Sequence, residues 1–250
     1  MAQSKINPNN MILAGGGSSP LSNNPEVKVS TDTGKTWIDV SANIPGEPRW
    51  ITKVLTHPTE SNTMYIVRSG LSENNKIYKT TDLGNTWTNI SGDLPNLPCW
   101  DLFVDPLYTQ PNNTNHLYAG MDVGVYRSTD GGDSWQAASN GLPAKYVYCL
   151  ATDDAYLYAG TYQDGIYRSG DHGDSWTPAN SGLGGLDIMS IASFEGRLYA
   201  TGREGEDDVL AHERILAKAR VAAVGLHGQV DAAVGEGVDR VGAHDAQAAQ

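Results

Sequence analysis

Short hydrophobic runs and polar breaks alternate along residues 1–201 of the chain. The runs are rich in Val, Ile, Leu, Tyr and Trp, and clusters of Gly, Pro, Asn and Asp separate them. Runs of about 4–8 residues between turn-forming residues are typical of β-strands. One unit of this pattern places four expected strands at 100–105, 116–120, 123–128 and 134–138. The chain is therefore predicted to be all-β.

The four-strand unit recurs along the chain. Complete units are expected at 50–90 and 146–179, on either side of the unit just described. Residues 11–15 and 27–30 match the second and third strands of an earlier unit, and residues 188–192 and 197–200 match the first two strands of a later one. The sequence predicts three complete antiparallel four-stranded units with a partial unit at each end.

A polar motif, Ser/Thr-x-Asp-x-Gly-x-Ser/Thr-Trp, follows the third strand and is named the repeated turn below. It occurs four times, at 30–37, 80–87, 128–135 and 169–176. Its Asp residues are spaced by 50, 48 and 41 residues, which is close to the length of a four-stranded propeller blade. The repeat predicts a β-propeller over residues 1–201.

Each residue of the repeated turn has an expected structural role. The Asp carboxylate can accept backbone N–H groups within a tight turn, the Gly supplies a positive φ, and the hydroxyl residue adds a local hydrogen bond. The Trp enters the next strand and fills space between blades. We therefore interpret the following residues as structural: Asp32, Gly34, Trp37, Asp82, Gly84, Trp87, Asp130, Gly132, Trp135, Asp171, Gly173 and Trp176.

The repeated turn resembles the Asp-box (BNR) repeat of the propeller superfamily that includes sialidases, xyloglucanases and sortilin-like proteins. The resemblance covers roughly residues 6–201. It implies four-stranded blades, an extracellular or periplasmic location, and a ring with more blades than this chain supplies. A partial ring would leave open blade edges through which the chain could self-associate. Met1 to Lys5 lead into Asn and Pro, so no signal peptide is recognised in this chain.

The pattern stops after residue 201. Residues 203–250 contain no aromatic residue and are rich in Ala, Gly and Val. The apolar spacing in 204–224 is compatible with a helix. A natural flexible tail, a linker and translation of an unrelated or shifted reading frame stay open as its origin. No fold or function is assigned to 202–250.

Charge and composition exclude several classes of partner. The 17 Lys and Arg against 29 Asp and Glu give a net charge of −12, which repels nucleic acid and anionic lipid. No apolar run is long enough to span a membrane. The two Cys residues lie fifty residues apart, which does not match the spacing of a metal-binding motif. No phosphate loop or dinucleotide-binding motif occurs in the sequence. The sequence predicts no metal site and no cofactor.

Candidate ligand-binding residues cluster where the first strand of each unit begins and where the second strand turns into the third. In a propeller these positions lie at one face near the axis, opposite the repeated turns. Aromatic side chains beside charged groups suit a sugar, whose ring stacks on them while the charges bind hydroxyls. The candidates are Arg49, Trp50, Trp100, Asp101, Tyr146, Tyr148 and Tyr162. An alternative stays open in which the aromatic residues only pack the ends of their strands.

Catalysis is the competing hypothesis. The Arg-Ile-Pro motif of sialidases does not occur. The segment 121–127, Met-Asp-Val-Gly-Val-Tyr-Arg, resembles an acidic strand-end motif of xyloglucan-cleaving endoglucanases, although Val125 breaks its Gly-Gly pair. Inverting glycoside hydrolysis needs two carboxyl groups, for which the resemblance suggests Asp122, with Asp164 or Asp101 as the second.

The sequence thus favours a non-enzymatic extracytoplasmic binding module for a carbohydrate or protein ligand. The alternative is a glycoside hydrolase fragment, of the xyloglucanase or sialidase type, that uses Asp122 with a second carboxylate, Asp164 or Asp101. A third hypothesis, an assembly factor resembling the photosystem II assembly propellers, calls for a basic patch that is not evident at a net charge of −12.

Overall fold

The chain is an all-β propeller of four-stranded antiparallel blades, as predicted. The computed structural model describes residues 1–15, 25–71, 74–106, 116–143, 146–153, 155–183, 185–194 and 197–203. Contacts divide the chain into Met1–His212 and Glu213–Gln250, and all described residues belong to the first unit. From residue 204 on, the predicted tail and its candidate helix lie outside the described residues.

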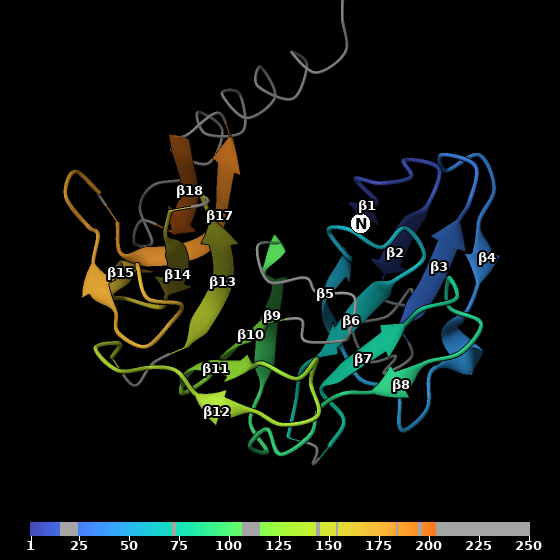
Figure 1. Ribbon diagram of the computed structural model, residues 1–250, viewed down its shortest axis with the longest axis horizontal. Helices are drawn as coiled ribbons and strands as arrows, with labels where there is room; N and C mark the ends of the chain where they lie inside the picture. Colours follow the sequence, from blue (N-terminus) through green and yellow to red (C-terminus); the bar gives the residue numbers. More distant parts are fainter. Residues whose placement is uncertain are drawn as a thin grey trace, which may run out of the picture. The chain divides into compact units, whose positions relative to one another are not determined.

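Four sheets have four strands each, and their strands pair with the next strand along the chain (Figure 1). The first two sheets contain β1 (Ala2–Gln3), β2 (Met11–Gly15), β3 (Glu26–Ser30) and β4 (Ile38–Asp39), then β5 (Ile51–Thr56), β6 (Met64–Arg68), β7 (Ile77–Thr80) and β8 (Thr88–Asn89). The next two contain β9 (Cys99–Val104), β10 (Leu117–Met121), β11 (Gly124–Ser128) and β12 (Gln136–Ala137), then β13 (Val147–Thr152), β14 (Leu157–Thr161), β15 (Gly165–Ser169) and β16 (Thr177–Pro178).

The two ends of the repeat differ from each other. A fifth sheet pairs β17 (Asp187–Phe194) with β18 (Arg197–Arg203), which is the partial unit predicted there. The first sheet is more complete than predicted, because β1 pairs with β2 and supplies a first strand. A strand of two residues is too short to show an alternating pattern, so β1 could not be predicted from the hydrophobic periodicity. A single 3-10 turn, η1 (Ser41–Asn43), follows β4 in the described part of the chain.

The four repeated turns share one hydrogen-bond pattern. In the first, Asp32 Oδ1 accepts from Ser30 Oγ at 2.8 Å and from the backbone N of Thr36 at 2.9 Å, while Oδ2 accepts from Thr36 Oγ1 at 2.6 Å. Ser30 Oγ accepts from the backbone N of Gly34 at 2.9 Å. The same contacts form around Asp82, Asp130 and Asp171. Carboxylate and hydroxyl together satisfy backbone donors that the reversal of the chain exposes.

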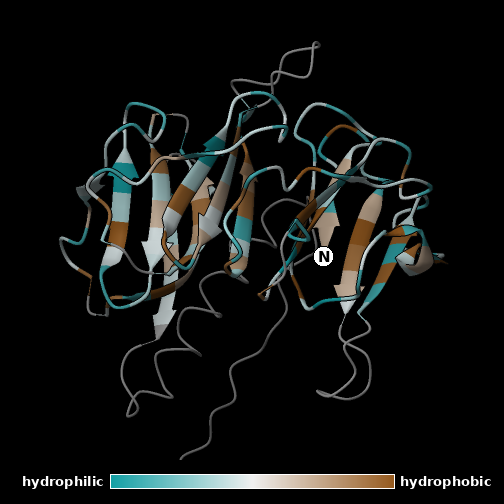
Figure 2. Cartoon of the chain, turned by 90° about the horizontal axis from the view of Figure 1, so that it is seen from below, coloured by the Kyte–Doolittle hydropathy of each residue, from teal (hydrophilic) through white to brown (hydrophobic). Residues whose placement is uncertain are grey.

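Every hydrophobic core cluster lies between two sheets. Leu117, Ala119 and Met121 of β10 pack with residues of the second sheet, whereas Tyr118 between them packs with the fourth sheet. Side chains alternate across a strand, so one strand supplies both interfaces. All five residues of β6, β10 and β14 are accordingly buried. Figure 2 shows hydrophobic positions in the strands, with more polar loops at their ends.

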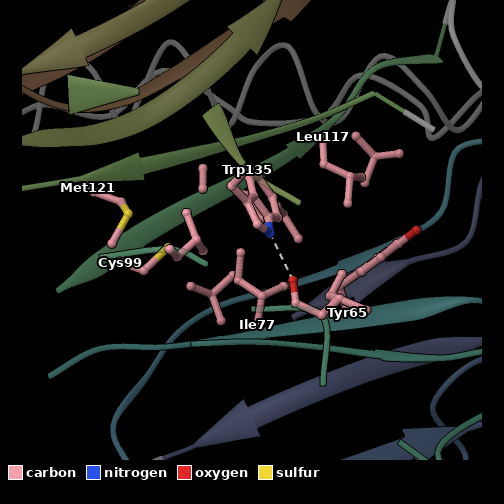
Figure 3. Packing of buried hydrophobic residues seen from close by; sticks show 12 residues of the cluster. Tyr65, Ile77, Cys99, Leu117, Met121 and Trp135 are labelled. Atoms are coloured by element: carbon pink, nitrogen blue, oxygen red, sulfur yellow. Dashed lines mark hydrogen bonds between the residues drawn. The ribbon is translucent and has the colours of Figure 1, made fainter. Parts of the chain in front are cut away.

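The Trp of the repeated turn joins each sheet to the preceding one. Trp135 donates from Nε1 to the carbonyl of Ile90 at 3.0 Å, inside the core between the second and third sheets (Figure 3). Trp176 donates to the carbonyl of Ala138 at 2.8 Å. Trp87 is also buried, but its Nε1 has no hydrogen-bond partner. The carbonyl of Val40, which takes the corresponding place, accepts the N–H of Asn43 in η1.

The difference between these indoles gives a paired test. We expect Trp135→Phe to lower the free energy of unfolding by about 1–3 kcal/mol more than Trp87→Phe, because only the first leaves a buried carbonyl without its donor. Urea unfolding followed by circular dichroism measures both values. Equal losses for the two variants would contradict the role assigned to the indole hydrogen bond.

The repeated turns also predict an acid transition. Asp32 and Asp171 have pKa values lowered to about 2, mainly by hydrogen bonds from Thr36 and Ser169 respectively. In Asp130 burial opposes the shift, but hydrogen bonds from Ser134 prevail and the pKa is again about 2. A carboxylate with a depressed folded-state pKa stabilises the fold above its unfolded value of 3.8, and this contribution is lost as pH falls towards 2.

We therefore expect the urea midpoint to fall between about pH 4 and pH 2. The Asp130→Asn variant has no carboxylate to titrate there, so its midpoint should fall less steeply over the same range. Parallel curves for the variant and the wild-type chain would contradict this account.

Candidate functional site

The predicted ligand face is assembled by hydrogen bonds between distant parts of the chain. The turn after the second strand is bonded to the start of the first strand in three successive sheets. Ser69 N donates to Trp50 O at 2.8 Å, Asp122 N to Pro98 O at 3.3 Å, and Tyr162 N to Tyr146 O at 3.0 Å. These bonds hold both sets of candidate residues at one edge of the sheets, called the loop edge below.

A β-bulge recurs at the loop edge in the first strand of four sheets. In β9, Cys99 pairs with Met121 and Asp101 with Gly120, so Trp100 has no partner on β10. Tyr148 is skipped in the same way in β13. Thr52 and Met189 take the same place in β5 and β17. A bulge redirects the side chain of the unpaired residue, and bulges often occur beside functional sites.

Two of the bulged residues form the centre of an aromatic cluster, defined as Trp100, Tyr146, Tyr148 and Tyr162. Trp100 and Tyr148 meet edge to face, with ring centres 5.3 Å apart. Tyr148 also contacts Tyr146 and Tyr162, both at 6.1 Å, and Tyr146 lies 5.7 Å from Tyr162. Tyr146 is 40% exposed, and the other three are partly buried. The cluster therefore joins the third and fourth sheets and keeps a surface open to solvent.

Carboxylates lie beside the aromatic cluster. Trp100 Nε1 donates to Asp122 Oδ1 at 2.6 Å. Asp187, the first residue of β17, accepts the backbone N of Gln163 at 2.7 Å. The pKa of Tyr148 is raised, mainly by burial, and Tyr162, Tyr146, Asp187 and Asp122 add to this through their charges. The Tyr148 hydroxyl thus stays protonated at neutral pH, in negatively charged surroundings.

Asp101 was expected among the ligand-binding residues, but its carboxylate faces the neighbouring sheets. It is 1% exposed and forms an ion pair with Lys53 at 2.8 Å. It also accepts the backbone N of Leu102 at 2.8 Å and of Leu150 at 2.9 Å. Burial raises the pKa of Asp101 and outweighs the opposing effect of Lys53. Asp101 connects β5, β9 and β13, and the aromatic cluster is defined without it.

Arg49, Trp50 and Asp164 lie outside the aromatic cluster as defined, although Asp164 follows Tyr162 of the cluster by two residues. Trp50 and Arg49 precede β5 in the second sheet, where Trp50 is 72% exposed. Asp164 lies in the turn between β14 and β15, and its backbone carbonyl accepts from Asn180 Nδ2 at 2.9 Å. The structure thus brings Trp100, three Tyr residues and Asp122 together, while Arg49 and Trp50 belong to a different part of the loop edge.

Lys53 and Lys76 were missed by the sequence analysis. Lys76 is buried and donates from Nζ to the carbonyl of Gly70. Burial lowers its pKa, and the nearby charge of Arg49 lowers it further. A Lys within a strand pattern normally indicates a solvent-facing position, so neither residue gave a signal. The bulge beside Lys53 also interrupts the alternation that would have assigned it a face.

The described residues contain two thiols but no cluster of metal-binding side chains. No group of three His, Cys, Asp or Glu residues that could hold a metal ion occurs among them. Cys99 and Cys149 are free and buried, and burial raises the pKa of both thiols. In the same part of the chain, no helix is long and apolar enough to cross a membrane.

Comparison with known proteins supports the propeller. The family model described as "Sortilin, neurotensin receptor 3" matches residues 25–123. No curated protein sequence matches the chain. The chain is similar in structure to a GH74 enzyme of Niastella koreensis, with a TM-score of 0.56 and 20% identity over 70% of this chain and 29% of that one.

Two further solved structures show the same likeness. The GH74 xyloglucanase of Xanthomonas campestris has a TM-score of 0.55 and 14% identity over 82% of this chain and 37% of that one. YCF48 bound to D1 peptide has a TM-score of 0.51 and 20% identity over 73% of this chain and 55% of that one. This chain therefore spans little more than half of YCF48 and less than two fifths of the GH74 proteins. At these identities the comparison establishes a shared β-propeller fold.

Proposed function

We propose that the chain is an extracytoplasmic binding module that takes a neutral carbohydrate at the aromatic cluster. The observation that carries the proposal is the set of four rings at 5.3–6.1 Å around the bulged residues Trp100 and Tyr148. Ring faces can stack on the C–H surface of a sugar, while phenol and carboxylate groups bind its hydroxyls. The cluster provides both kinds of contact at one edge of the fold.

The charge of the cluster narrows the class of ligand. Asp122 and Asp187 lie beside it, and the whole chain carries a net charge of −12. Both disfavour an acidic sugar, such as a sialylated glycan, relative to a neutral one. A xyloglucan fragment is a suitable neutral probe, because one structurally similar protein is a xyloglucanase. A protein ligand is the alternative, for which YCF48 bound to D1 peptide offers a parallel in fold.

The repeated turns support assignment to Asp-box propellers as part of this proposal. All four use the same carboxylate and hydroxyl pattern at 2.5–3.0 Å. Their bonds are internal to each turn, so they explain the fold and leave the loop edge to bind the ligand. An extracellular or periplasmic location and self-association through open sheet edges belong to the same proposal.

Binding at the cluster is tested by truncating an exposed ring. Tyr146→Ala should weaken binding of xyloglucan oligosaccharides about fivefold, since an aromatic contact contributes about 1 kcal/mol. Tyr156→Ala is the matched control, because Tyr156 is 38% exposed against 40% for Tyr146 and contacts Arg168 and Tyr158 instead. Isothermal titration calorimetry gives both affinities. Weaker binding in Tyr156→Ala with no change in Tyr146→Ala would exclude the cluster as the sugar site.

A second candidate function is glycoside hydrolysis, favoured by the position of Asp122 beside the cluster. Its carboxylate accepts the Trp100 indole N–H at 2.6 Å, which fixes its orientation next to rings that could hold a sugar. The inverting reaction needs a second carboxyl group at about 6.5–9.5 Å, and Asp164 in the next sheet is the candidate.

Hydrolysis predicts a specific loss of activity. If the chain cleaves xyloglucan, Asp122→Asn should reduce the release of reducing ends at least about 100-fold while oligosaccharide binding is kept, because the amide cannot exchange the proton. A melting temperature close to that of the wild-type chain would show that the fold is intact. If the wild-type chain binds xyloglucan without cleaving it, the hydrolase hypothesis is excluded and the binding module is supported.

A further inference from the structure

The outer edge of β18 carries backbone groups that no described strand pairs with. The second strand of each of the four complete sheets pairs on both sides, whereas β18 pairs only with β17 among the described residues (Figure 1). All five residues of β6, β10 and β14 are buried, but none of residues 198–202 in β18 is. Tyr199 is 41% exposed, whereas its counterparts Tyr118 and Tyr158 are buried. An unpaired strand edge of this kind is a template for a further strand.

The sequence of β18 indicates which strand would fit. Residues 198–200 read Leu-Tyr-Ala, as do 117–119 of β10 and 157–159 of β14. β10 pairs with Gly-Val-Tyr-Arg-Ser in β11, and β14 pairs with Gly-Ile-Tyr-Arg-Ser in β15. The register is the same in both, with the Tyr of the third strand opposite the Ala of the second. The matching third strand for β18 is therefore a segment of this sequence with its Tyr opposite Ala200.

The core between the fourth and fifth sheets has a different aromatic content from the other three cores. In each of those three, a Trp of a repeated turn packs together with a Tyr of a third strand: Trp87 with Tyr78, Trp135 with Tyr126, and Trp176 with Tyr167. The cluster between the fourth and fifth sheets contains neither kind of residue in the described part of the chain. The sequence has no Trp after Trp176. A third strand followed by a repeated turn would bring both side chains.

The carbonyl of Ala179 is a suitable acceptor for such an indole. Trp176 donates from Nε1 to the carbonyl of Ala138, the residue after β12. Ala179 follows β16 in the same way, and the backbone N of both Ala residues bonds to the third strand of its own sheet. Ala138 is buried, whereas Ala179 is partly exposed. The acceptor position thus recurs in the fourth sheet, next to β17 and β18.

Ala200 directs its N–H and C=O towards the open edge. Both backbone groups of a residue in an antiparallel strand face the same neighbour, and successive residues face opposite neighbours. Tyr162 N bonds to Tyr146 O, on the side of the first strand. Alternation then places the backbone groups of Ala159 on the side of β15. Ala200 is the counterpart of Ala159, so its groups face away from β17.

We propose that the β18 edge binds an extended segment of a second polypeptide with the pattern Gly-Ile-Tyr-Arg-Ser-x-Asp-x-Gly-x-Ser-Trp. The strand pairs with β18, its Tyr and Trp enter the core between the fourth and fifth sheets, and the indole bonds to the carbonyl of Ala179. The Arg of the segment also suits a chain with a net charge of −12. Binding at β18 does not depend on the proposed sugar site.

For β18 this segment suits better than a second copy of the chain. The third strands β3, β7, β11 and β15 already pair on both sides, so a copy could not offer one without opening its own sheet. Residues 204–250 contain no Tyr, Ser or Trp. Two β18 strands paired with each other would add no Trp to the core, and two chains of net charge −12 repel each other.

The test uses the full chain and a synthetic peptide that copies residues 163–177, in isothermal titration calorimetry. We expect saturable binding, together with slower amide hydrogen exchange in β18 as its outward N–H groups become bonded. Peptides with Tyr167→Ala or Trp176→Ala should bind at least about tenfold more weakly, because each loses a large buried aromatic surface. Absence of saturable binding, or equal binding of a scrambled peptide of the same composition, would overturn the proposal.

Two backbone changes test the strand pairing. Ala200→Pro removes the outward N–H and keeps the bonds to β17, so it should weaken peptide binding at least about tenfold with little change in melting temperature. An N-methyl group on Tyr167 of the peptide removes the complementary donor and leaves the protein unaltered, so folding cannot explain its effect. If the N-methylated peptide binds as tightly as its parent, pairing with β18 is excluded.

Controls separate this edge from other sites. Tyr146→Ala alters the aromatic cluster and should bind the peptide like the wild-type chain, and loss of binding there would place the peptide at the cluster instead. Absence of sugar binding with peptide binding intact would overturn only the sugar site. Light scattering tests the rival occupant. A dimer that Ala200→Pro makes monomeric, without peptide binding, would assign the edge to a second copy and overturn the proposal.

Discussion

Packing between sheets is the constraint on which the rest of the structure depends. Each of the four hydrophobic clusters contains residues from two successive sheets, and a central strand such as β10 contributes to two of them. A blade of this size cannot bury its faces alone, so its stability comes from its neighbours. The close approach is visible at Gly120 and Gly160, where an added Cβ would lie 2.7 Å from Val147 O and 2.7 Å from Ile188 Cγ2 of the next sheet.

The repeated turns also take part in the packing between sheets. Gly132 has φ +105°, and a Cβ there would lie 2.7 Å from the Cβ of Ile90 in the preceding sheet. The neighbouring Trp135 then bonds to the carbonyl of the same residue. The residues of one turn therefore both reverse the chain and pack against the preceding sheet. Trp87 packs between the first and second sheets without this hydrogen bond, because the corresponding carbonyl, that of Val40, accepts the N–H of Asn43 in η1. The packing of the indole between sheets therefore does not require its hydrogen bond.

Most strands and all four turns were predictable because their signals are local and repeat along the chain. The two-residue β1 was not, since so short a strand has no period. The buried role of Asp101 also escaped prediction, because it depends on partners from other sheets. The aromatic residues of the loop edge were predicted, but their contact was not, because it depends on bulges that break the alternation at Trp100 and Tyr148.

The recurring bulge keeps the same strand pairing with different residue types at the bulged position. Thr, Trp, Tyr and Met occupy the same bulged position in β5, β9, β13 and β17, and the ladder around each is alike. The residue at this position makes no cross-strand pair, so exchanging it leaves the backbone ladder unchanged. Thr52 also donates from Oγ1 to the carbonyl of Cys99 in the next sheet at 3.0 Å, so that position contributes to the scaffold. Positions 100, 148 and 189 therefore form a natural set for a combinatorial library, in which ligand preference could be altered at the loop edge while the backbone ladder stays constant.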